Sequence, residues 1–316
     1  MRITVLAGGV GGARFLRGVR AARPDDAITA IINTGDDVTL HGLRITPDLD
    51  SCTYALGGAH DEERGWGRAG ESWRIQDEFK GYGAEPTWFN LGDLDIATHL
   101  VRTRMLDAGF PLSQVVAALC ERWQPGVTLL PMTDDRCETH VVCELDGRRQ
   151  AIHFQEWWIK HRAALPAEAF VQIGRDEATA APGVIDAIGS ADVVLIAPSN
   201  PVVSIGTILG LGDIRAAVVD GPAPVVGLSP IIGTAPVRGM ADLCLPALGV
   251  EVSAEGVGRH YGARKAGGVL DGWLIHETDV ADVPGVEVRA VPLYMSDDCA
   301  TASMVDAALE LAGVGS

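Results

Sequence analysis

Four aspartates within a fifteen-residue stretch carry the clearest chemical signal in this sequence. They belong to the segments NTGDD and TPDLD, which follow an apolar run. Carboxylates this close repel one another unless a cation lies among them, and Mg²⁺ typically takes one or two carboxylates together with water and phosphate. Aspartates also cap turns and helices, which is the alternative role for each of them. The four residues are Asp36, Asp37, Asp48 and Asp50.

The stretch GGVGGARF places four glycines between an apolar run and a predicted helix. It fits neither standard nucleotide motif, because Arg14 replaces the third glycine of a dinucleotide fingerprint and Ala13 stands at the sixth position of a Walker A loop. Glycines nevertheless let a ligand approach the backbone, and amides at a helix N-terminus attract anions. A tight turn without a ligand is the alternative. The glycines expected to contact substrate are Gly8, Gly9, Gly11 and Gly12.

A third cluster, NLGDLDIATHLVR, surrounds a predicted helix start, with Asp95 as the N-cap. His99 lies one turn further along and has the chemistry to contact a phosphate or an aromatic ring. A lone histidine on a helix is more often a packed residue, which is the alternative here. The candidate binding residues of this cluster are Asp93, Thr98 and His99.

Two further segments place polar residues where an apolar run ends. The segments are APSNPVVSIG (197–206) and GLSPIIG (227–233). Hydroxyl groups, an amide side chain and the amides at a helix N-terminus can hold a nucleotide without any lysine. If the two strands are neighbours, their ends form one cleft at the carboxyl edge of a sheet. The residues expected in this cleft are Ser199, Asn200, Ser204 and Ser229.

The elements that must hold these loops alternate between strands and helices. Several apolar runs are continuous, which is typical of parallel strands covered on both faces. The runs cover residues 2–8, 27–33, 192–201, 223–233, 271–277 and 286–293. Helices are predicted near 13–22 and over 299–313, the latter with Gly313 as a C-cap. The pattern predicts an α/β fold: a Rossmann-like, mainly parallel sheet with helices on both faces.

Residues 51–126 differ from both ends in being rich in helix formers, tryptophan and charge. Two helices are predicted there, over 97–110 and 112–123. We therefore expect a helical insertion subdomain at 51–126 and a Rossmann-like core formed by 1–50 and 127–316.

A β-hairpin appendage is predicted after the insertion. Segment 139–154 has two strand-like runs around Asp146 and Gly147, a pair typical of a type I′ turn. A helix is predicted over 156–166, ending at Pro166.

The composition limits the classes of function and partner that this chain can have. The chain has 316 residues, of which 47% are hydrophobic, so it can bury a large core. Its net charge of −17 argues against nucleic acid and anionic membranes as partners, because both require clustered lysine and arginine. No apolar run reaches about eighteen residues, and the first run is too short for a signal peptide, so we expect a cytoplasmic protein. The six cysteines include no CxxC pair, which predicts reduced thiols and no zinc site.

The motifs also occur in the order of a known family. They are GGVGGA, NTGDD, TPDLD, LGDxDxATH, LPMTDD, IHFQEWW, APSNPVVSIG and SPIIG, spread over residues 3–312. This series resembles the 2-phospho-L-lactate transferase family of deazaflavin coenzyme F-420 biosynthesis, and its actinobacterial phosphoenolpyruvate transferases look most similar. The resemblance implies a Rossmann-like core with a helical subdomain, and usually a homodimer.

The resemblance further implies a Mg²⁺-dependent reaction between two small molecules. A guanosine-diphosphate-activated donor, enolpyruvoyl-2-diphospho-5′-guanosine or its 2-phospholactyl counterpart, would pass its phosphoester group to the ribityl hydroxyl of the deazaflavin Fo. GMP would be released, and the product would be dehydro coenzyme F-420-0. The three-carbon acid stays open, because phosphoenolpyruvate, 2-phospholactate and 3-phosphoglycerate differ only by small groups.

Carried over position by position, the resemblance assigns Asp50, as the catalytic residue, to the Fo hydroxyl or the metal. Asp48 would be a metal ligand, with Asn33 and Asp37 beside it. The residues assigned to the guanine nucleotide are Ser199, Asn200 and Ser204, with Ser229 close by.

One position departs from the family pattern. The family often shows LGDRDxATH, whereas Leu94 stands here in place of the arginine. A cationic contact to Fo or phosphate is therefore missing, or Arg102 or Arg104 supplies it.

Two other functions remain as alternatives. An NAD(P)- or deazaflavin-dependent oxidoreductase would use the opening glycines, although Arg14 counts against the fingerprint. A non-catalytic nucleotide-binding regulator of the same fold would lack the aspartate pair needed for Mg²⁺, whereas Asp48 and Asp50 are both present.

Overall fold

The computed structural model describes residues 1–315. Its centre is a seven-stranded sheet in the order β14-β13-β10-β9-β1-β2-β5, and every neighbouring pair is parallel. The strands are β1 (Arg2–Ala7), β2 (Ala27–Ile32), β5 (Thr128–Pro131), β9 (Val193–Ile196), β10 (Val225–Leu228), β13 (Gly272–His276) and β14 (Glu287–Val291). The parallel sheet predicted from the continuous apolar runs is therefore confirmed.

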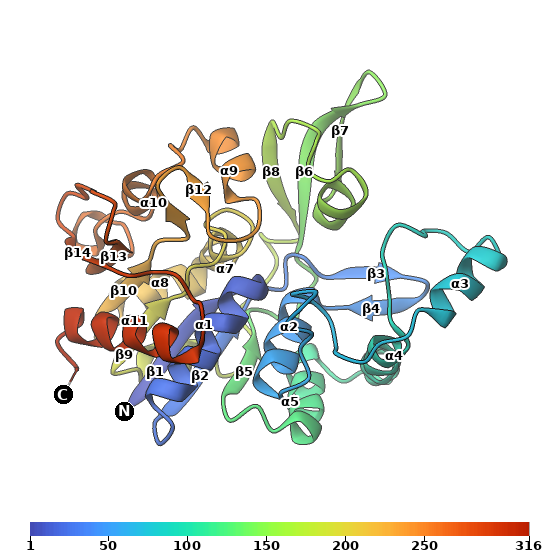
Figure 1. Cartoon of the computed structure of the whole chain (residues 1–316), viewed down its shortest axis with the longest axis horizontal. Helices are drawn as coiled ribbons and strands as arrows, with labels where there is room; N and C mark the ends of the chain where they lie inside the picture. Colours follow the sequence, from blue (N-terminus) through green and yellow to red (C-terminus); the bar gives the residue numbers. More distant parts are fainter. Residues whose placement is uncertain (316) are drawn as a thin grey trace.

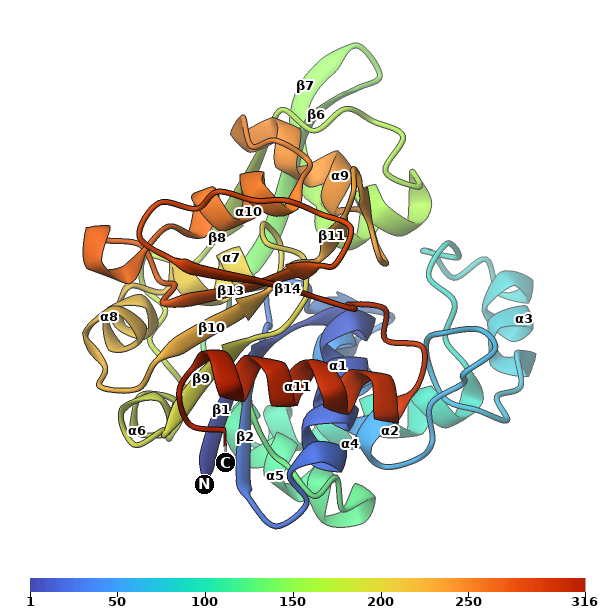
Figure 2. The same cartoon turned by 60° about the vertical axis from the view of Figure 1, so that its left-hand side comes forward.

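Helices cover both faces of this sheet, because alternate residues of a strand point to opposite sides. In β1, Ile3 and Val5 pack with α1 (Gly9–Ala22) and α11 (Asp298–Leu311), whereas Leu6 packs into the core on the other face. α1 and α11 lie side by side over the sheet (Figure 2). The helices of the opposite core are α6 (Val184–Gly189), α7 (Ile205–Gly210), α8 (Gly212–Asp220) and α10 (Ala254–Tyr261).

The segment predicted as a helical insertion contains most of α2 (Pro47–Leu56), followed by α3 (Arg74–Gly81), α4 (Asp93–Asp107) and α5 (Leu112–Trp123). Figure 1 shows α3 and α4 beside the hairpin of β3 (Val38–Leu40) and β4 (Leu43–Ile45), away from the parallel sheet. α2 continues across residue 50 and packs against α1. The division into a core of 1–50 with 127–316 and an insertion of 51–126 stays a prediction.

An antiparallel sheet of three strands projects from the core (Figure 1). Its strands are β6 (Glu138–Leu145), β7 (Arg148–His153) and β8 (Ala169–Ile173). The predicted turn is confirmed, because Asp146 and Gly147 join β6 to β7 with φ angles of 53° and 69°. The third strand, β8, was not among the predicted elements.

Three predicted details differ from the structure. α1 begins at Gly9, because the glycines themselves form its first turn. α4 begins at Asp93 with Gly92 as N-cap, so Asp95 lies in the first turn and does not cap the helix. Of the helix predicted over 156–166, only the π-helix η1 (Glu156–Lys160) forms, because left-handed backbone follows at residues 162 and 163, with φ angles of 51° and 50°.

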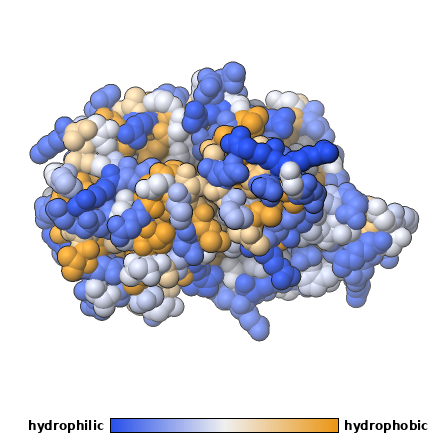
Figure 3. Space-filling model, turned by 90° about the horizontal axis from the view of Figure 1, so that it is seen from above, coloured by the Kyte–Doolittle hydropathy of each residue, from blue (hydrophilic) through white to orange (hydrophobic). Residues whose placement is uncertain are grey.

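The remaining elements are short. They are β11 (Ile231–Ile232), β12 (Ala235–Pro236), α9 (Ala241–Cys244), η2 (Leu245–Leu248) and η3 (Arg264–Ala266). Seen from above, hydrophilic and apolar residues are interspersed over the surface (Figure 3). Among residues 1–315, no helix combines the length and apolar character needed to cross a membrane.

Candidate functional site

A cavity of about 770 Å³ opens where β1, β2 and β9 end. Its wall is built from segments far apart in the sequence, from Gly8 after β1 to Met295 after β14. Parallel α/β sheets bind their ligands at this carboxyl edge, and the volume suits a nucleotide-sized molecule. Many of the residues singled out by the sequence therefore converge on one site.

The predicted residues divide into two groups. Those that line the cavity are Gly8, Gly9, Gly11, Asp48, Asp50, His99, Ser199, Asn200 and Ser204. Those absent from its wall are Gly12, Asn33, Asp37, Asp93, Thr98 and Ser229. Asp36 and Asp95 also line it.

The glycine loop allows an unusually close approach of side chains to its backbone. The Ser199 hydroxyl accepts a hydrogen bond from the Gly8 amide at 3.1 Å and donates one to the Gly8 carbonyl at 2.7 Å, which ties the end of β9 to the end of β1. A Cβ on Gly8 would lie 2.6 Å from Asp48 Oδ2 and 2.7 Å from Ser204 Cβ. Gly8 is therefore needed for packing within the site.

We expect Gly8→Ala to lower the free energy of unfolding by about 1–3 kcal/mol, because the new methyl group overpacks the site. The backbone itself tolerates alanine there, since Gly8 is extended with φ −158°. Urea unfolding measures the change. Gly189→Ala is the control, because no atom lies near the position of its Cβ. Equal unfolding midpoints for Gly8→Ala and the wild type would contradict the close packing.

Asp36 and Asp48 form a buried pair of carboxylates that both accept hydrogen bonds from the side-chain amide of Asn33. Asn33 Nδ2 donates to Asp36 Oδ1 at 3.2 Å and to Asp48 Oδ2 at 2.9 Å. Burial, followed by the charge of Asp48, raises the pKa of Asp36. Burial also raises the pKa of Asp48. Asn33 therefore supports the pair from behind the cavity wall, and a cation would relieve the repulsion between its members.

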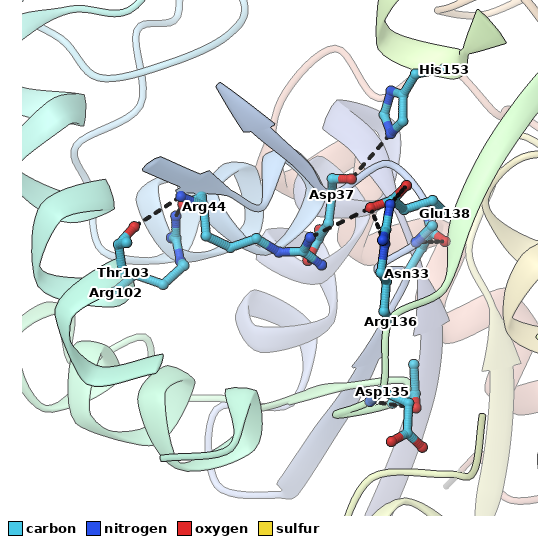
Figure 4. A network of polar contacts seen from close by, with 11 residues as sticks. Asn33, Asp37, Arg44, Arg102, Thr103, Asp135, Arg136, Glu138 and His153 are labelled. Carbon is cyan, nitrogen blue, oxygen red and sulfur yellow. Dashed lines mark hydrogen bonds and ion pairs between the residues drawn. The ribbon is translucent and has the colours of Figure 1, made fainter. Parts of the chain in front are cut away.

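Asp37 is absent from the cavity wall and belongs to a separate network of polar contacts (Figure 4). Its Oδ2 lies 3.1 Å from the Arg44 guanidinium, and its carbonyl oxygen lies 3.2 Å from His153 Nε2. The Arg44 amide donates to Thr103 Oγ1 at 2.8 Å. These contacts link the β3–β4 hairpin to α4 and β7. Burial raises the pKa of Asp37 to about 7.

Asp50 enters the cavity wall from the first turn of α2. Its Oδ1 accepts a hydrogen bond from the buried Arg102 guanidinium of α4. Its Oδ2 is buried without a hydrogen-bond partner among residues 1–315. His99, also in the wall, lies with Nδ1 2.9 Å from Arg102 Nη1, and burial lowers the pKa of His99 to about 4.

Three other candidate residues of α4 differ in whether they reach the cavity. Asp93 is exposed and accepts a hydrogen bond from the Ser72 amide at 2.8 Å. Thr98 is buried outside the cavity wall. Asp95 does line the cavity, and burial raises its pKa to about 7.

The loops that follow β9 and β10 contribute unequally to the cavity wall. Asn200 Oδ1 accepts from the amides of Val202 at 2.9 Å and Val203 at 3.2 Å, which orders the loop before α7. Ser204 precedes α7 as its N-cap and lines the cavity. Ser229 closes a local turn instead, because its hydroxyl, within residues 1–315, bonds only to the backbone of Ile231.

Several residues of the wall were not among the predicted site residues, and for the tryptophans core packing was the expected role. The aromatic side chains are Tyr54, Trp66, Phe89, Phe154 and Trp158, and the arginines are Arg64, Arg162 and Arg238. Arg238 adjoined the SPIIG segment in the sequence, but no spacing rule indicated that its side chain would reach the site.

The donor set is suited to Mg²⁺. No group of three His, Cys, Asp or Glu side chains within residues 1–315 is arranged to hold a metal ion alone. Mg²⁺ needs fewer protein ligands than three, since one or two carboxylates suffice when water and phosphate complete its coordination shell. Asp36 and Asp48 fit this requirement, because both are buried, both line the cavity and they repel each other. Asp50 has one oxygen left after its contact with Arg102.

The fold and the cavity define a doubly wound α/β protein with a cavity at the carboxyl edge of its parallel sheet, the edge where such proteins bind ligands. Comparison with known proteins makes the assignment specific. The chain belongs to the CofD family, whose model, described as 2-phospho-L-lactate transferase CofD, matches residues 3–289.

Relatives in the curated proteins agree with this membership, and two solved structures share the fold. The chain is 63% identical to a phosphoenolpyruvate transferase of Nocardia farcinica, over 99% of this chain and 95% of the relative. It is 57% identical to one of Mycobacterium avium, over 99% of each chain. A crystal structure of a UPF0052-family protein from Bacillus halodurans matches the fold with a TM-score of 0.63 and 16% identity, covering 97% of this chain and 99% of that one. A second crystal structure of the same Bacillus halodurans protein gives a TM-score of 0.62 at 18% identity, covering 96% of this chain and 97% of that one.

Proposed function

We propose that this chain is a phosphoenolpyruvate transferase of coenzyme F-420 biosynthesis. It moves the phosphoenolpyruvyl group of enolpyruvoyl-2-diphospho-5′-guanosine to the ribityl hydroxyl of Fo and releases GMP. The observation that carries this proposal is the 63% identity to the Nocardia farcinica phosphoenolpyruvate transferase over nearly the whole chain. The cavity at the carboxyl edge of the sheet supports it, because its wall combines a glycine loop suited to a nucleotide with aromatic side chains suited to a ring system.

The two substrates have distinct places in this proposal. The guanine nucleotide lies against the glycine loop and the α7 N-terminus, near Ser199, Asn200 and Ser204. Fo lies on the side of α2 and α4, where the aromatic side chains of the wall can cover its ring. This arrangement brings the ribityl hydroxyl toward Asp50.

The transfer is a displacement at the phosphorus of the phosphoenolpyruvyl group. The hydroxyl oxygen of Fo forms a bond to this phosphorus, and the bond from phosphorus to the bridging oxygen breaks. That oxygen keeps the electron pair and leaves with GMP. The hydroxyl proton passes to Asp50 Oδ2, which has no partner among residues 1–315.

Mg²⁺ would be held by Asp48 with Asp36, and it would neutralise the phosphate charge that an acidic chain otherwise repels. The backbone amides at the start of α1 add a partial positive charge on the same side. A homodimer and a cytoplasmic location complete the proposal. Nucleic acids and membranes are not among the expected partners, in keeping with the net charge of −17.

Purified protein incubated with Fo, Mg²⁺ and each guanylylated acid in turn tests the function. We expect GMP release and a product of the mass of dehydro coenzyme F-420-0 with the phosphoenolpyruvyl donor. Faster turnover of the 2-phospholactyl donor would reassign the three-carbon acid. Absence of product with every donor would refute the transferase function.

Arg238 is expected to contribute to donor binding. It lines the cavity and makes no ion pair or side-chain hydrogen bond within residues 1–315. Burial, followed by the charge of Arg238, lowers the pKa of Arg14, so two cations lie close together near the start of α1. An anion would relieve their repulsion.

Arg238→Ala should therefore raise KM for the guanylylated donor by about 10- to 100-fold, the value of one charge-assisted hydrogen bond. Steady-state kinetics at saturating Fo measure this change. Arg148→Ala, on the exposed strand β7, is the matched control. A rise confined to KM for Fo would contradict the assignment.

A further inference from the structure

Arg102 is one of the largest fully buried side chains of the protein. It comes from the middle of α4, three residues after His99. Its Nη2 donates to Asp50 Oδ1, and its Nη1 lies 3.1 Å from the Arg44 carbonyl oxygen and 2.9 Å from His99 Nδ1. Asp50 and His99 line the cavity, whereas Arg102 does not. Arg102 thus lies behind two residues of the wall and touches both.

The contact with Asp50 distinguishes the two carboxylate oxygens. Oδ1 is held by Arg102, whereas Oδ2 is buried and has no partner among residues 1–315. The Asp50 residue as a whole is 7% exposed. A carboxylate fixed through one oxygen cannot rotate freely, so the other oxygen keeps one direction relative to the cavity wall.

The contact with His99 determines which ring nitrogen carries the proton. A guanidinium group only donates hydrogen bonds, so His99 Nδ1 must be the accepting nitrogen. The proton of the neutral ring then resides on Nε2. The 3.7 Å separation between His99 Nδ1 and Asp50 Oδ2 is consequently not a hydrogen bond, and His99 does not occupy Oδ2.

We propose that Arg102 is a positioning residue for the transfer reaction. It presents Asp50 Oδ2 to the substrate hydroxyl, and it holds His99 in the Nε2-protonated form, which can donate to an anionic oxygen of the donor. The proposal rests on the proposed function for the identity of the substrates. It also removes one of the replacements considered for the family arginine at Leu94, because Arg102 lies off the cavity wall and acts through its neighbours, without contacting a substrate itself.

Kinetics of Arg102→Met and Arg102→Lys test the positioning role. We expect Arg102→Met to lower kcat by on the order of 100-fold, the scale seen when a reacting group is misplaced by about 1 Å. KM for Fo and for the donor should stay within about threefold, because Arg102 touches neither substrate. Arg102→Lys should recover part of kcat. Arg148→Met, on an exposed strand, is the control for loss of an arginine.

A double-mutant cycle separates positioning from a general structural role. If Arg102 acts through Asp50, Arg102→Met should cause less than about a threefold further loss in the Asp50→Asn background, since coupled residues are not additive. Independent, multiplying losses would overturn the proposal. An Arg102→Met variant that changed KM and left kcat intact would also overturn the proposal.

The His99 tautomer can be read without any substrate. Nuclear magnetic resonance of isotope-labelled histidine, with the His99 signal assigned by its absence in His99→Gln, should show a protonated Nε2 and a bare Nδ1. Arg102→Met should change this to a mixture of tautomers. A protonated Nδ1 in the wild type would overturn the proposal even if the Arg102 variants failed to fold. Lack of transferase activity in a wild type with the expected tautomer would instead refute the proposed function.

Discussion

Asp50→Asn is expected to lower kcat by about 100- to 10,000-fold, the usual contribution of a positioned proton acceptor. The amide retains the shape of the side chain and can still accept from Arg102, but it cannot take the proton of the attacking hydroxyl. Binding of both substrates should change little. Quenched-flow or steady-state measurement of GMP release gives the value.

Magnesium titration of the same variant decides between the two roles considered for Asp50. If the residue accepts the proton, raising the Mg²⁺ concentration leaves kcat low. Partial restoration of activity at high Mg²⁺ would show that Asp50 is a metal ligand and would exclude the proton-acceptor role. Asp107→Asn, at the exposed end of α4, is the control for loss of one negative charge.

Asp48→Asn is expected to weaken Mg²⁺ binding strongly and to make activity dependent on high Mg²⁺. The wild type buries Asp36 and Asp48 side by side, so a cation that binds only the folded protein should raise its unfolding temperature. At a Mg²⁺ concentration 100 times the dissociation constant, this linkage amounts to about 2.7 kcal/mol. The variant should lose most of that gain.

Thermal unfolding with Mg²⁺ and with a chelator measures the effect without any substrate. In the chelator, Asp48→Asn should be at least as stable as the wild type, because one of two repelling buried charges has been removed. An equal response of both proteins to Mg²⁺ would show that the ion binds elsewhere. Asp36→Asn should behave like Asp48→Asn if the two carboxylates share the ion.

The sequence was most informative where local chemistry alone decides structure. Continuous apolar runs predicted the parallel strands, because a strand covered on both faces cannot alternate. The Asp146–Gly147 pair predicted the hairpin, because few residues adopt positive φ at low cost. The strand ends at Gly8 and Ser199 were expected in the site because parallel strands present their carboxyl ends at one edge.

Local patterns failed where distant residues decide the outcome. β8 has only five residues and pairs with β6, from which β7 and η1 separate it, so no local pattern indicated this strand. The helix after residue 156 ends at Lys160, just before left-handed Arg162, although nothing in EWWIKHRAALP forbids a longer helix before Pro166. Tertiary packing decided both cases.

The candidate site shows the same division. Asp48 and Asp50 were found because acidic clusters are visible in a sequence. The distinction between Asp37, which pairs with Arg44, and Asp36, which faces the cavity, depends on how the β3–β4 hairpin folds back. Adjacent residues with the same side chain cannot be separated by pattern alone.

The spread of the cavity wall along the chain has a consequence for synthesis. Residues from Gly8 to Met295 line it, so a nascent chain lacks part of the wall until almost the entire polypeptide has left the ribosome. Substrates thus have little to bind during translation. Once folding is complete, a nucleotide bound as proposed would join the loop after β1 to the loop after β9, and Gly8 and Ser199 in these loops are 191 residues apart in the chain. Its release should then precede global unfolding, so that nucleotide saturation protects even backbone amides far from the cavity from hydrogen exchange.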